Sequence, residues 1–369
     1  MTIGLLREAF PETRVSLTDE GVSTLVKRGI KVLVEQGAGD SAFCNDDAYR
    51  KAGAVVLSAA EVMQQSSVLL CIHPPSPAVL TALQGKVLIG AYQPLYNREW
   101  TAATASNGVT CFSLDMLPRT TRAQSMDILS SQANIAGYKA VLLAATTYSR
   151  YFPMFMTAAG SIAPAKVLIL GAGVAGLQAI ATAKRLGAVI EVFDTRPAVK
   201  EEVMSLGAKF VEVEGAADAS QAGGYAVEQS DAYQQRQRER IATAAAKADI
   251  IISTAQIPGK KAPILLTEQM IDALRPGSVI IDLAAATGGN TPFTENNKTI
   301  QRNGVTIIGN SALYSMMPAD ASKLYGKNLV NFLQLILTAD GQLFLNWEDE
   351  LVKGSCITHE GKLVHERFK

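Results

Sequence analysis

A glycine-rich turn near the middle of the chain places the tightest constraint on its fold. Residues 171–176 are Gly-Ala-Gly-Val-Ala-Gly; they directly follow an apolar run at 166–170 and precede a helical pattern over 174–186. In a strand–turn–helix unit, the first glycine permits a tight turn, the second lets the backbone approach a pyrophosphate, and the third allows close helix–strand packing. The helix N-terminus supplies amide donors for the phosphates. The turn therefore predicts a dinucleotide-binding βαβ unit.

An acidic residue follows the second predicted strand, at 189–193. Asp194 lies about 20 residues beyond the glycines, where an acid accepts hydrogen bonds from the adenosine ribose hydroxyls. A carboxylate there also repels a 2′-phosphate. Arg196 weakens the argument, because a nearby arginine can accommodate that phosphate. We favour NAD(H) over NADP(H), because the acid occupies the end of the strand.

The second half of the chain alternates apolar runs with helical patterns. The runs have the composition of strands covered on both faces and lie at 167–170, 189–193, 210–213, 249–253, 278–282 and 305–308. Helical stretches such as 174–186 and 236–247 separate most of them. This alternation predicts a doubly wound, mostly parallel sheet over 138–318. Ligands bind at the carboxyl edge of such sheets, so the small-residue loops after the fourth and fifth strands are expected there.

The first 115 residues show the same alternation without a glycine fingerprint. Strands are expected at 2–6, 32–35, 68–72, 87–90 and 109–112. Two long helical patterns, 125–149 and 319–337, are expected to cross between the halves. We predict an α/β protein with two Rossmann-like doubly wound domains, the first discontinuous. The predicted ranges are 1–125 with 330–369 for the first domain, 138–318 for the second, and 126–137 and 319–329 for interdomain helix segments.

Composition narrows the function classes. The 369 residues contain 34 Lys and Arg and 34 Asp and Glu, so the chain has no electrostatic footprint for nucleic acid or an anionic membrane surface. Four scattered cysteines favour a reducing compartment, and three histidines without a metal-binding motif predict that no metal is bound. No apolar stretch reaches the roughly 18 residues of a membrane span. A cytosolic-type protein is expected.

A polar stretch at 117–132 interrupts the apolar background between the predicted domains. Its distinctive members are Arg119, Arg122, Gln124, Asp127 and Ser130. On a helix, Asp127 shares a face with Ser130 and with Ser131. These side chains suit hydrogen bonding to a nicotinamide carboxamide, which the protein need only orient. An Arg–Asp ion pair between domains, with a serine-rich helix start, explains the same residues.

The stretch 119–138 resembles the nucleotide-orienting loop of proton-translocating NAD(P) transhydrogenase, domain I of the alpha subunit. This is the NAD(H)-binding component of the alanine dehydrogenase/transhydrogenase family. The resemblance extends from the N-terminus nearly to the C-terminus. Further similar segments are 156–160, 171–181, 223–225 and 257–259.

The resemblance implies a homodimeric, peripheral component on the cytoplasmic side of the inner membrane. It would bind NADH and pass hydride directly to NADP⁺, which a partner domain binds, while a membrane domain couples the transfer to proton movement. The residues implied near the nicotinamide ribose and carboxamide are Arg119, Gln124, Asp127 and Ser130, with Gln124 also reaching the partner's NADP(H). Tyr225 would be the tip of a mobile loop that closes over the nucleotide. The other implied cofactor-binding residues are Arg122, Ser131, Gly171, Ala172, Gly173, Val174, Ala175, Gly176, Asp194, Thr195, Arg196, Gly224, Thr254, Ala255 and Gln256.

Two other functions stay open. An NAD-dependent, alanine-type dehydrogenase resembles this fold and glycine motif, and Arg14 matches that family's substrate arginine. The lysine expected within 70–75 and the histidine expected within 91–96 are missing, however, and oxidising an amine needs an acid/base group. A non-catalytic NAD-binding regulatory module is the second alternative. Affinity alone would not require polar groups around the reacting ring.

Overall fold

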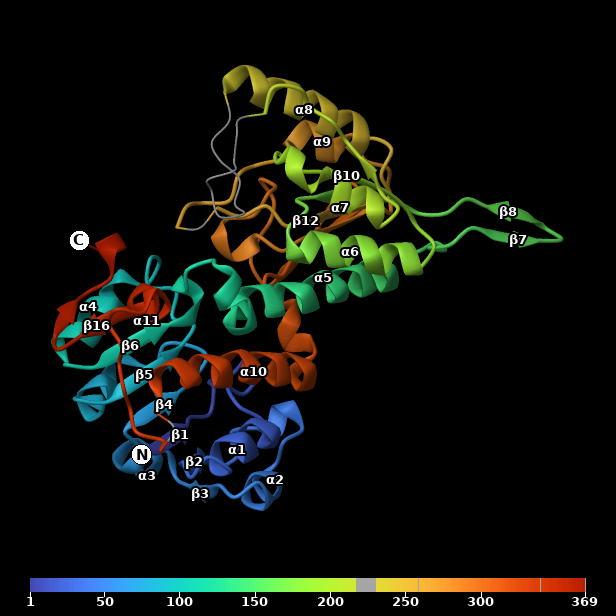
Figure 1. The fold of residues 1–369 in the computed structure, drawn as a ribbon. Coiled ribbons are helices and arrows are strands. Elements are labelled where there is room, and N and C mark those ends of the chain that lie inside the picture. Colours follow the sequence, from blue (N-terminus) through green and yellow to red (C-terminus); the bar gives the residue numbers. More distant parts are fainter. Residues whose placement is uncertain (217–229, 258, 339, 369) are drawn as a thin grey trace. The chain divides into compact units, whose positions relative to one another are not determined.

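Two parallel-rich sheets, one in each half of the fold, carry the architecture. The structure is a computed structural model that describes residues 1–216, 230–257, 259–338 and 340–368 (Figure 1). The chain divides into unit 1, residues 1–132 and 315–369, and unit 2, residues 133–314. The predicted fold class is confirmed: the protein is α/β with two Rossmann-like units, and the first unit is discontinuous in sequence.

The sheet of unit 2 has the strand order expected of a dinucleotide-binding fold. Its order is β11-β10-β9-β12-β13-β15-β14. The strands are β9 (Lys166–Leu170), β10 (Val189–Phe193), β11 (Lys209–Phe210), β12 (Ile250–Ser253), β13 (Val279–Asp282), β14 (Lys298–Arg302) and β15 (Val305–Gly309). Without β14, which pairs antiparallel with β15, the described strands run parallel in the order 3-2-1-4-5-6. The switch in strand order therefore lies between β9 and β12.

Helices cover both faces of this sheet. They are α5 (Ile128–Thr147), α6 (Val174–Arg185), α7 (Lys200–Ser205), α8 (Asp231–Ala245) and α9 (Glu268–Asp272). Successive residues of β9 alternate between two cores: Val167 and Ile169 pack with α5 and α6, while Leu168 and Leu170 pack with α8 and α9. Since side chains alternate along a strand, an unbroken apolar run is what two covered faces require.

Two element boundaries in unit 2 differ from the sequence prediction. Helix α8 begins at Asp231, five residues before the predicted start, because the Ser230 side chain accepts a hydrogen bond from Tyr233 N and caps the helix. Strand β11 ends at Phe210, and 211–213 continues without strand structure. At this sheet edge the pairing is short, although Val211 N still donates to the Val192 carbonyl at 2.8 Å.

Unit 1 repeats the same topology without the glycine turn. Its sheet order is β17-β16-β6-β5-β4-β1-β2-β3. The strands are β1 (Thr2–Leu5), β2 (Lys31–Glu35), β3 (Val55–Leu57), β4 (Val68–Leu70), β5 (Val87–Gly90), β6 (Thr110–Ser113), β16 (Cys356–His359) and β17 (Lys362–Leu363). Strands β1 to β6 are parallel in the order 3-2-1-4-5-6, and β16 adds antiparallel to β6. The C-terminal segment thus returns to this sheet.

The helices of unit 1 also form two layers. They are α1 (Asp19–Val26), α2 (Asp46–Lys51), α3 (Ala59–Gln65), α4 (Arg98–Ser106), α10 (Pro318–Ile336) and α11 (Glu350–Ser355). Helices α1 and α10 share one core with the sheet, and α3 and α4 share the other. The sequence analysis expected α10 to cross between domains. The structure differs: α10 lies within unit 1, because its apolar stripe packs against that sheet (Figure 1).

Shorter elements complete the described fold. The 3₁₀ helices are η1 (Asp40–Ala42), η2 (Pro77–Leu83), η3 (Leu114–Met116), η4 (Thr121–Met126), η5 (Pro197–Val199), η6 (Ala285–Thr287), η7 (Leu313–Met316) and η8 (Glu366–Phe368). A hairpin that the sequence analysis did not predict, β7 (Phe155–Thr157) with β8 (Gly160–Ile162), extends from unit 2. Among the described helices, none is long and apolar enough to cross a membrane.

We expect Phe332 to be a main stabilising residue of unit 1. Its ring is fully buried on α10, with its centroid 5.5 Å from that of Phe112. Phe332→Ala should lower the free energy of unfolding of unit 1 by about 3–5 kcal/mol, through lost burial and a cavity. The matched change Leu324→Ala, on the same helix but 37% exposed, should cost less than about 1 kcal/mol. Urea unfolding followed by circular dichroism measures both, and equal losses would contradict the packing described.

Candidate functional site

The glycine turn of unit 2 has the backbone geometry that the sequence predicted for a phosphate loop. Gly171 has a φ of +104° and its N–H donates to the Phe193 carbonyl at 2.8 Å. A Cβ on Gly176 would lie 1.9 Å from the Gly171 carbonyl oxygen, so only glycine lets α6 pack this closely. A Cβ on Gly173 would meet no described atom within 4 Å. Gly171 and Gly176 therefore serve the fold, while the space at Gly173 is left open.

The start of α6 presents backbone donors. Gly173 is the N-cap residue, with extended backbone, and no described side chain caps the helix there. The first-turn N–H groups of a helix lack intrahelical acceptors, and the helix dipole makes this end electropositive. A dinucleotide pyrophosphate fits such a terminus, because it supplies both negative charge and acceptors. The residues present thus fit the cofactor that the sequence analysis expected.

Asp194 connects the end of β10 to this turn. Its carboxylate accepts hydrogen bonds from Ala172 N at 2.7 Å and Arg196 N at 2.8 Å, and the Asp194 side chain is 6% exposed. Arg196 also donates through Nε at 2.9 Å and Nη2 at 2.7 Å. These hydrogen bonds to the carboxylate raise the pKa of Arg196. Arg196 is thus tied to Asp194, and Thr195 lies half-buried between the two.

The loops after β12 and β13 are fixed by a buried amide that sequence reasoning missed. Asn290 is fully buried; its Oδ1 accepts from Ser253 Oγ and from Ala255 N, and its Nδ2 donates to the carbonyls of Ala255 at 2.9 Å and Pro263 at 2.8 Å. Thr254 Oγ1 lies 3.2 Å from both the Leu170 and Gly171 carbonyls. The Thr254–Gln256 loop therefore lies against the glycine turn, at the carboxyl edge of the sheet.

Asp282 holds Asn290 in place through its backbone. This carboxylate, at the end of β13, accepts from Asn290 N at 2.6 Å, Thr294 Oγ1 at 2.7 Å and Ala284 N at 2.9 Å. Burial raises the pKa of Asp282, against the hydrogen bonds that favour its charged form. An acid ending an apolar strand, followed by Gly-Gly-Asn, was the available signal in the sequence. Gln256 is held separately, since its Nε2 donates to the Leu283 carbonyl at 3.0 Å.

The polar stretch of unit 1 forms a 3₁₀ helix followed by a capped α-helix. In η4, Ala123 and Met126 are buried, whereas Arg122 and Gln124 are exposed. The predicted helix start at 125 is wrong: α5 begins at Ile128. The reason is Asp127, whose carboxylate accepts from Ser130 N at 2.9 Å and Ser130 Oγ at 2.5 Å. An aspartate in this position ends one element and caps the next.

The members of the polar stretch differ in what they contact. Ser131 Oγ donates to the Ile128 carbonyl at 3.2 Å, within the first turn of α5. Arg122 pairs with Asp349, the N-cap residue of α11, which is an ion pair within unit 1. Arg119 is exposed. Gly224 and Tyr225 lie outside the described residues, and their predicted roles stay predictions.

A second polar cluster lies at the switch between β1 and β4 of unit 1. Arg14 is 4% exposed and donates to Glu12 through Nε at 2.9 Å and Nη2 at 2.6 Å, and to Gln132 Oε1 through Nη1 at 2.9 Å. His73 Nε2 lies 2.6 Å from Oε2 of the same Glu12 carboxyl group. Burial opposes ionisation of Glu12, but the hydrogen bonds from Arg14 and His73 hold its pKa well below the usual range. The arginine thus has an internal carboxylate partner.

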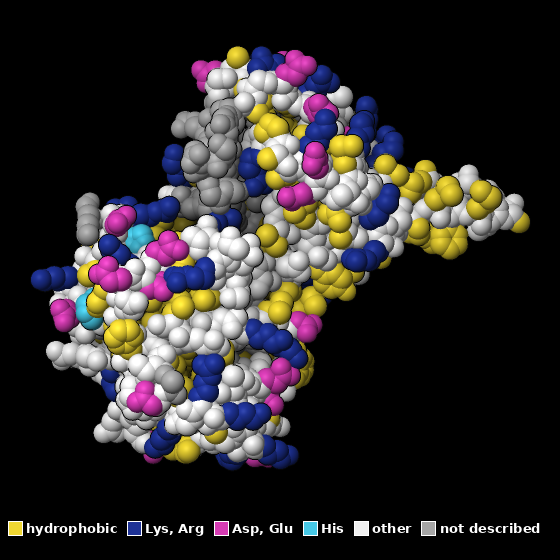
Figure 2. All heavy atoms as spheres, viewed as in Figure 1, with side chains coloured by type: hydrophobic (Ala, Val, Ile, Leu, Met, Phe, Trp, Pro, Cys, Tyr) yellow, Lys and Arg dark blue, Asp and Glu magenta, His cyan; other side chains and the backbone are white. Residues whose placement is uncertain are grey.

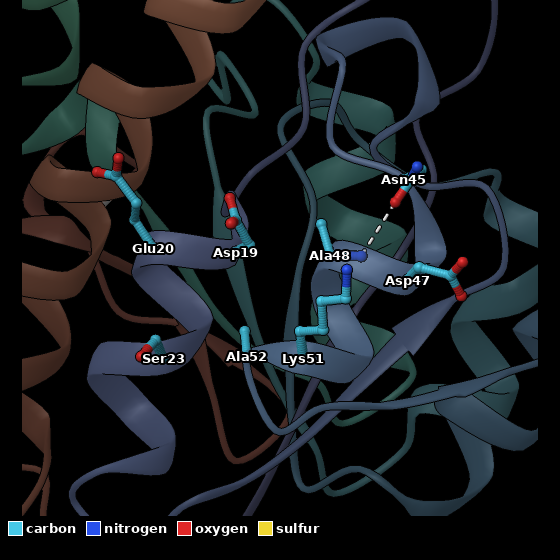
Figure 3. Close-up of a pocket in the computed structure, with 8 residues that line it drawn as sticks. All are labelled: Asp19, Glu20, Ser23, Asn45, Asp47, Ala48, Lys51 and Ala52. Atoms are coloured by element: carbon cyan, nitrogen blue, oxygen red, sulfur yellow. Dashed lines mark hydrogen bonds between the residues drawn. The ribbon is translucent and has the colours of Figure 1, made fainter.

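An open depression between α1 and α2 belongs to neither cluster. Its lining, shown in Figure 3, comes from Asp19, Glu20, Ser23, Asn45, Asp47, Ala48, Lys51 and Ala52. The hydrogen bond drawn there, from Ala48 N to Asn45 Oδ1, caps α2. It contains no residue predicted for the site. Among the residues that the structure describes, no group of three or more His, Cys, Asp or Glu is placed to hold a metal ion.

Comparison with known proteins gives the family. The model for the alanine dehydrogenase/PNT N-terminal domain matches residues 4–136, and that for the C-terminal domain matches residues 140–366. The chain belongs to the alanine dehydrogenase/PNT family. The predicted resemblance to transhydrogenase is therefore confirmed at family level, and membership in this family implies NAD(H) binding.

Similar proteins separate the two branches of the family. The chain is 46% identical to an NAD(P) transhydrogenase alpha subunit of Rhodospirillum rubrum, covering 99% of this chain and 98% of that protein. A transhydrogenase structure from Sinorhizobium meliloti superimposes with a TM-score of 0.87 at 42% identity over the whole of both chains. An L-alanine dehydrogenase structure gives 0.80 at 26% identity, covering 100% of this chain and 98% of the other. The similarity supports an oxidoreductase-type transhydrogenase component.

Two glycine variants distinguish folding from cofactor binding. Gly173→Ala should leave thermal unfolding unchanged, since its Cβ meets open space, but weaken NADH binding by about tenfold or more, which is about 1.4 kcal/mol. Gly176→Ala should destabilise unit 2, because its Cβ would collide with the Gly171 carbonyl. Fluorescence titration with NADH and differential scanning calorimetry separate the effects. If Gly173→Ala bound NADH like the unmodified protein, the pyrophosphate would not lie at this turn.

Proposed function

We propose that this chain is the NAD(H)-binding component of a proton-translocating transhydrogenase. NADH would bind at the carboxyl edge of the unit 2 sheet, and its hydride would pass directly to NADP⁺ on a partner domain. The observation that carries this proposal is the uncapped N-terminus of α6, joined to Asp194 through Ala172 N. The 46% identity with a transhydrogenase alpha subunit over nearly the whole chain supports the reaction. Proton translocation would need a separate membrane component.

The chemistry asks little of the protein in covalent terms. The hydride carries both electrons from the C4 carbon of NADH to the C4 carbon of NADP⁺, giving NAD⁺ and NADPH without a proton step at carbon. The chain's own residues therefore bind, orient and exclude water. Arg119, Gln124, Asp127 and Ser130 are proposed to contact the nicotinamide ribose and carboxamide. Mutual hydrogen bonding preorders Asp127 and Ser130 for this role, which supports the assignment.

The environment of Asp194 supports a preference for NAD(H). Its carboxylate stands at the end of β10, where a ribose hydroxyl can donate to it and a 2′-phosphate would be repelled. Arg196 could in principle serve that phosphate. Its guanidinium is instead paired with Asp194, with Nη2 2.7 Å from Oδ2. NADP(H) is accordingly assigned to the partner domain and not to this chain.

The cluster around Arg14 weighs against the alternative reaction, oxidation of an amino acid. An arginine that binds a substrate carboxylate must give its fork-shaped donors to that carboxylate. Here Nε and Nη2 of Arg14 both donate to Glu12. The lower identity with L-alanine dehydrogenase, 26%, agrees. We therefore expect no NADH production from alanine by the purified chain.

The test is stopped-flow mixing of the NADH-loaded chain with a transhydrogenase NADP⁺-binding domain. Gln124→Asn should lower the single-turnover rate constant about tenfold to a hundredfold and change NADH affinity less than about threefold, because the shorter amide misplaces the ring without removing the binding contacts. The control Gln334→Asn, on the exposed side of α10, should transfer hydride normally. NADH binding without transfer by the unmodified chain would overturn the proposal; equal losses in rate and affinity would refute the role of Gln124.

The β7–β8 hairpin supports the proposed homodimer. Its side chains Phe155, Met156 and Ile162 are 44%, 75% and 44% exposed, and Figure 2 shows hydrophobic side chains along it. Tyr151 stacks on Phe155 with ring centroids 4.7 Å apart. An exposed two-stranded hairpin is only marginally stable by itself, and contiguous apolar surface marks protein contacts. We assign a second copy of this chain as the partner of the hairpin.

Met156→Asp should therefore convert the dimer to a monomer, because a charge would be buried without a partner. Sedimentation equilibrium over a range of protein concentrations measures the change. The matched variant Met204→Asp, on α7 and 55% exposed, should leave the dimer intact. A dimer that survives Met156→Asp unchanged would place the interface elsewhere.

A further inference from the structure

A single backbone carbonyl in the polar stretch of unit 1 is held by two side chains. The Ser125 carbonyl oxygen accepts a hydrogen bond from Asn328 Nδ2 at 2.8 Å and another from Asn331 Nδ2 at 2.9 Å. Both asparagines lie on α10, three residues apart, so they project from the same face of the helix. The two amides together occupy both lone-pair directions of one acceptor.

These asparagines are costly choices for their positions. Asn331 interrupts the apolar run at 329–337, and Asn328 is 8% exposed between core residues of the same helix. The Oδ1 atom of Asn328 is buried and has no hydrogen-bond donor among the described residues. Burying an amide oxygen without a donor costs about 1–3 kcal/mol. Core packing alone would be served better by leucine at these positions, so the amides point to another role.

The clamp formed by Asn328 and Asn331 acts on the peptide that follows Gln124. On either side of Ser125, the buried Met126 fixes the backbone inward, whereas the exposed Gln124 side chain projects away from the core. With the Ser125 peptide plane held by two donors, the orientations of Gln124 and of the entry to Asp127 are set together. A second attachment to α10 follows in the chain, because the side-chain amide of Gln132 donates to the Ala321 carbonyl at 3.1 Å.

We propose that Asn328 and Asn331 are positioning residues for hydride transfer. They hold the η4 segment so that Gln124 meets the nicotinamide in one orientation. This inference rests on the proposed function and names residues beyond those that contact the nucleotide. Their effect is on geometry: they touch neither cofactor nor reacting atoms. Loss of the clamp therefore reduces the rate of transfer more than the affinity for NADH.

The experiment compares Asn331→Ala, Asn328→Ala and the double variant with Gln334→Ala, an exposed control on the same helix. Each single variant leaves one donor on the Ser125 carbonyl and should slow single-turnover transfer only severalfold. The double variant should slow it about a hundredfold, more than the product of the single effects, while NADH affinity stays near that of the unmodified chain. Use of NADH deuterated at C4 should show an isotope effect in all of them.

A second readout does not depend on transfer. Hydrogen–deuterium exchange of peptides covering 121–131 should be faster in the double variant and unchanged in Gln334→Ala, with the melting temperature recorded for each. Unmodified rates in a folded double variant would overturn the positioning role, as would parallel losses of affinity and rate. Absence of transfer in the unmodified chain would instead reject the proposed function, so the two failures are distinguishable.

Discussion

The close approach of α6 to the turn that precedes it is the constraint on which unit 2 depends. A side chain on Gly176 would occupy the position of the Gly171 carbonyl, so the helix can lie against the turn only without one. That approach points the start of α6 along the carboxyl edge of the sheet and brings Ala172 N to the Asp194 carboxylate. The neighbouring loop follows, because Thr254 Oγ1 bonds to the carbonyls at the start of the turn.

The two units use one strand order for different purposes. In unit 2 the switch between β9 and β12 carries the glycine turn and the open space at Gly173. In unit 1 the corresponding switch, between β1 and β4, holds the buried Glu12–Arg14 pair, which satisfies its own charges. A shared topology therefore offers two crevices, and the side chains decide which of them can accept an anionic ligand.

The polar stretch of unit 1 illustrates how buried amides shape an exposed surface. Its outward residues, such as Gln124, have few restraints of their own, so their orientation comes from the backbone beneath them. Buried Ala123 and Met126, the Asp127 cap and the hydrogen bonds to the Ser125 carbonyl supply that restraint. Rigid support of this kind matters when the protein's contribution to a reaction is orientation.

The sequence by itself determined the fold class, the strands around the glycine turn and the candidate residues Asp194 and Gln124, because periodicity and local turn chemistry are encoded over short distances. Only the tertiary structure decided that α10 belongs to unit 1, that α5 begins after Asp127, and that Asn290 and Asn328 support loops distant in sequence. Hydrogen bonds such as Asn328 to Ser125, which join residues about 200 positions apart, leave no periodic signal. They exist only once the chain has packed.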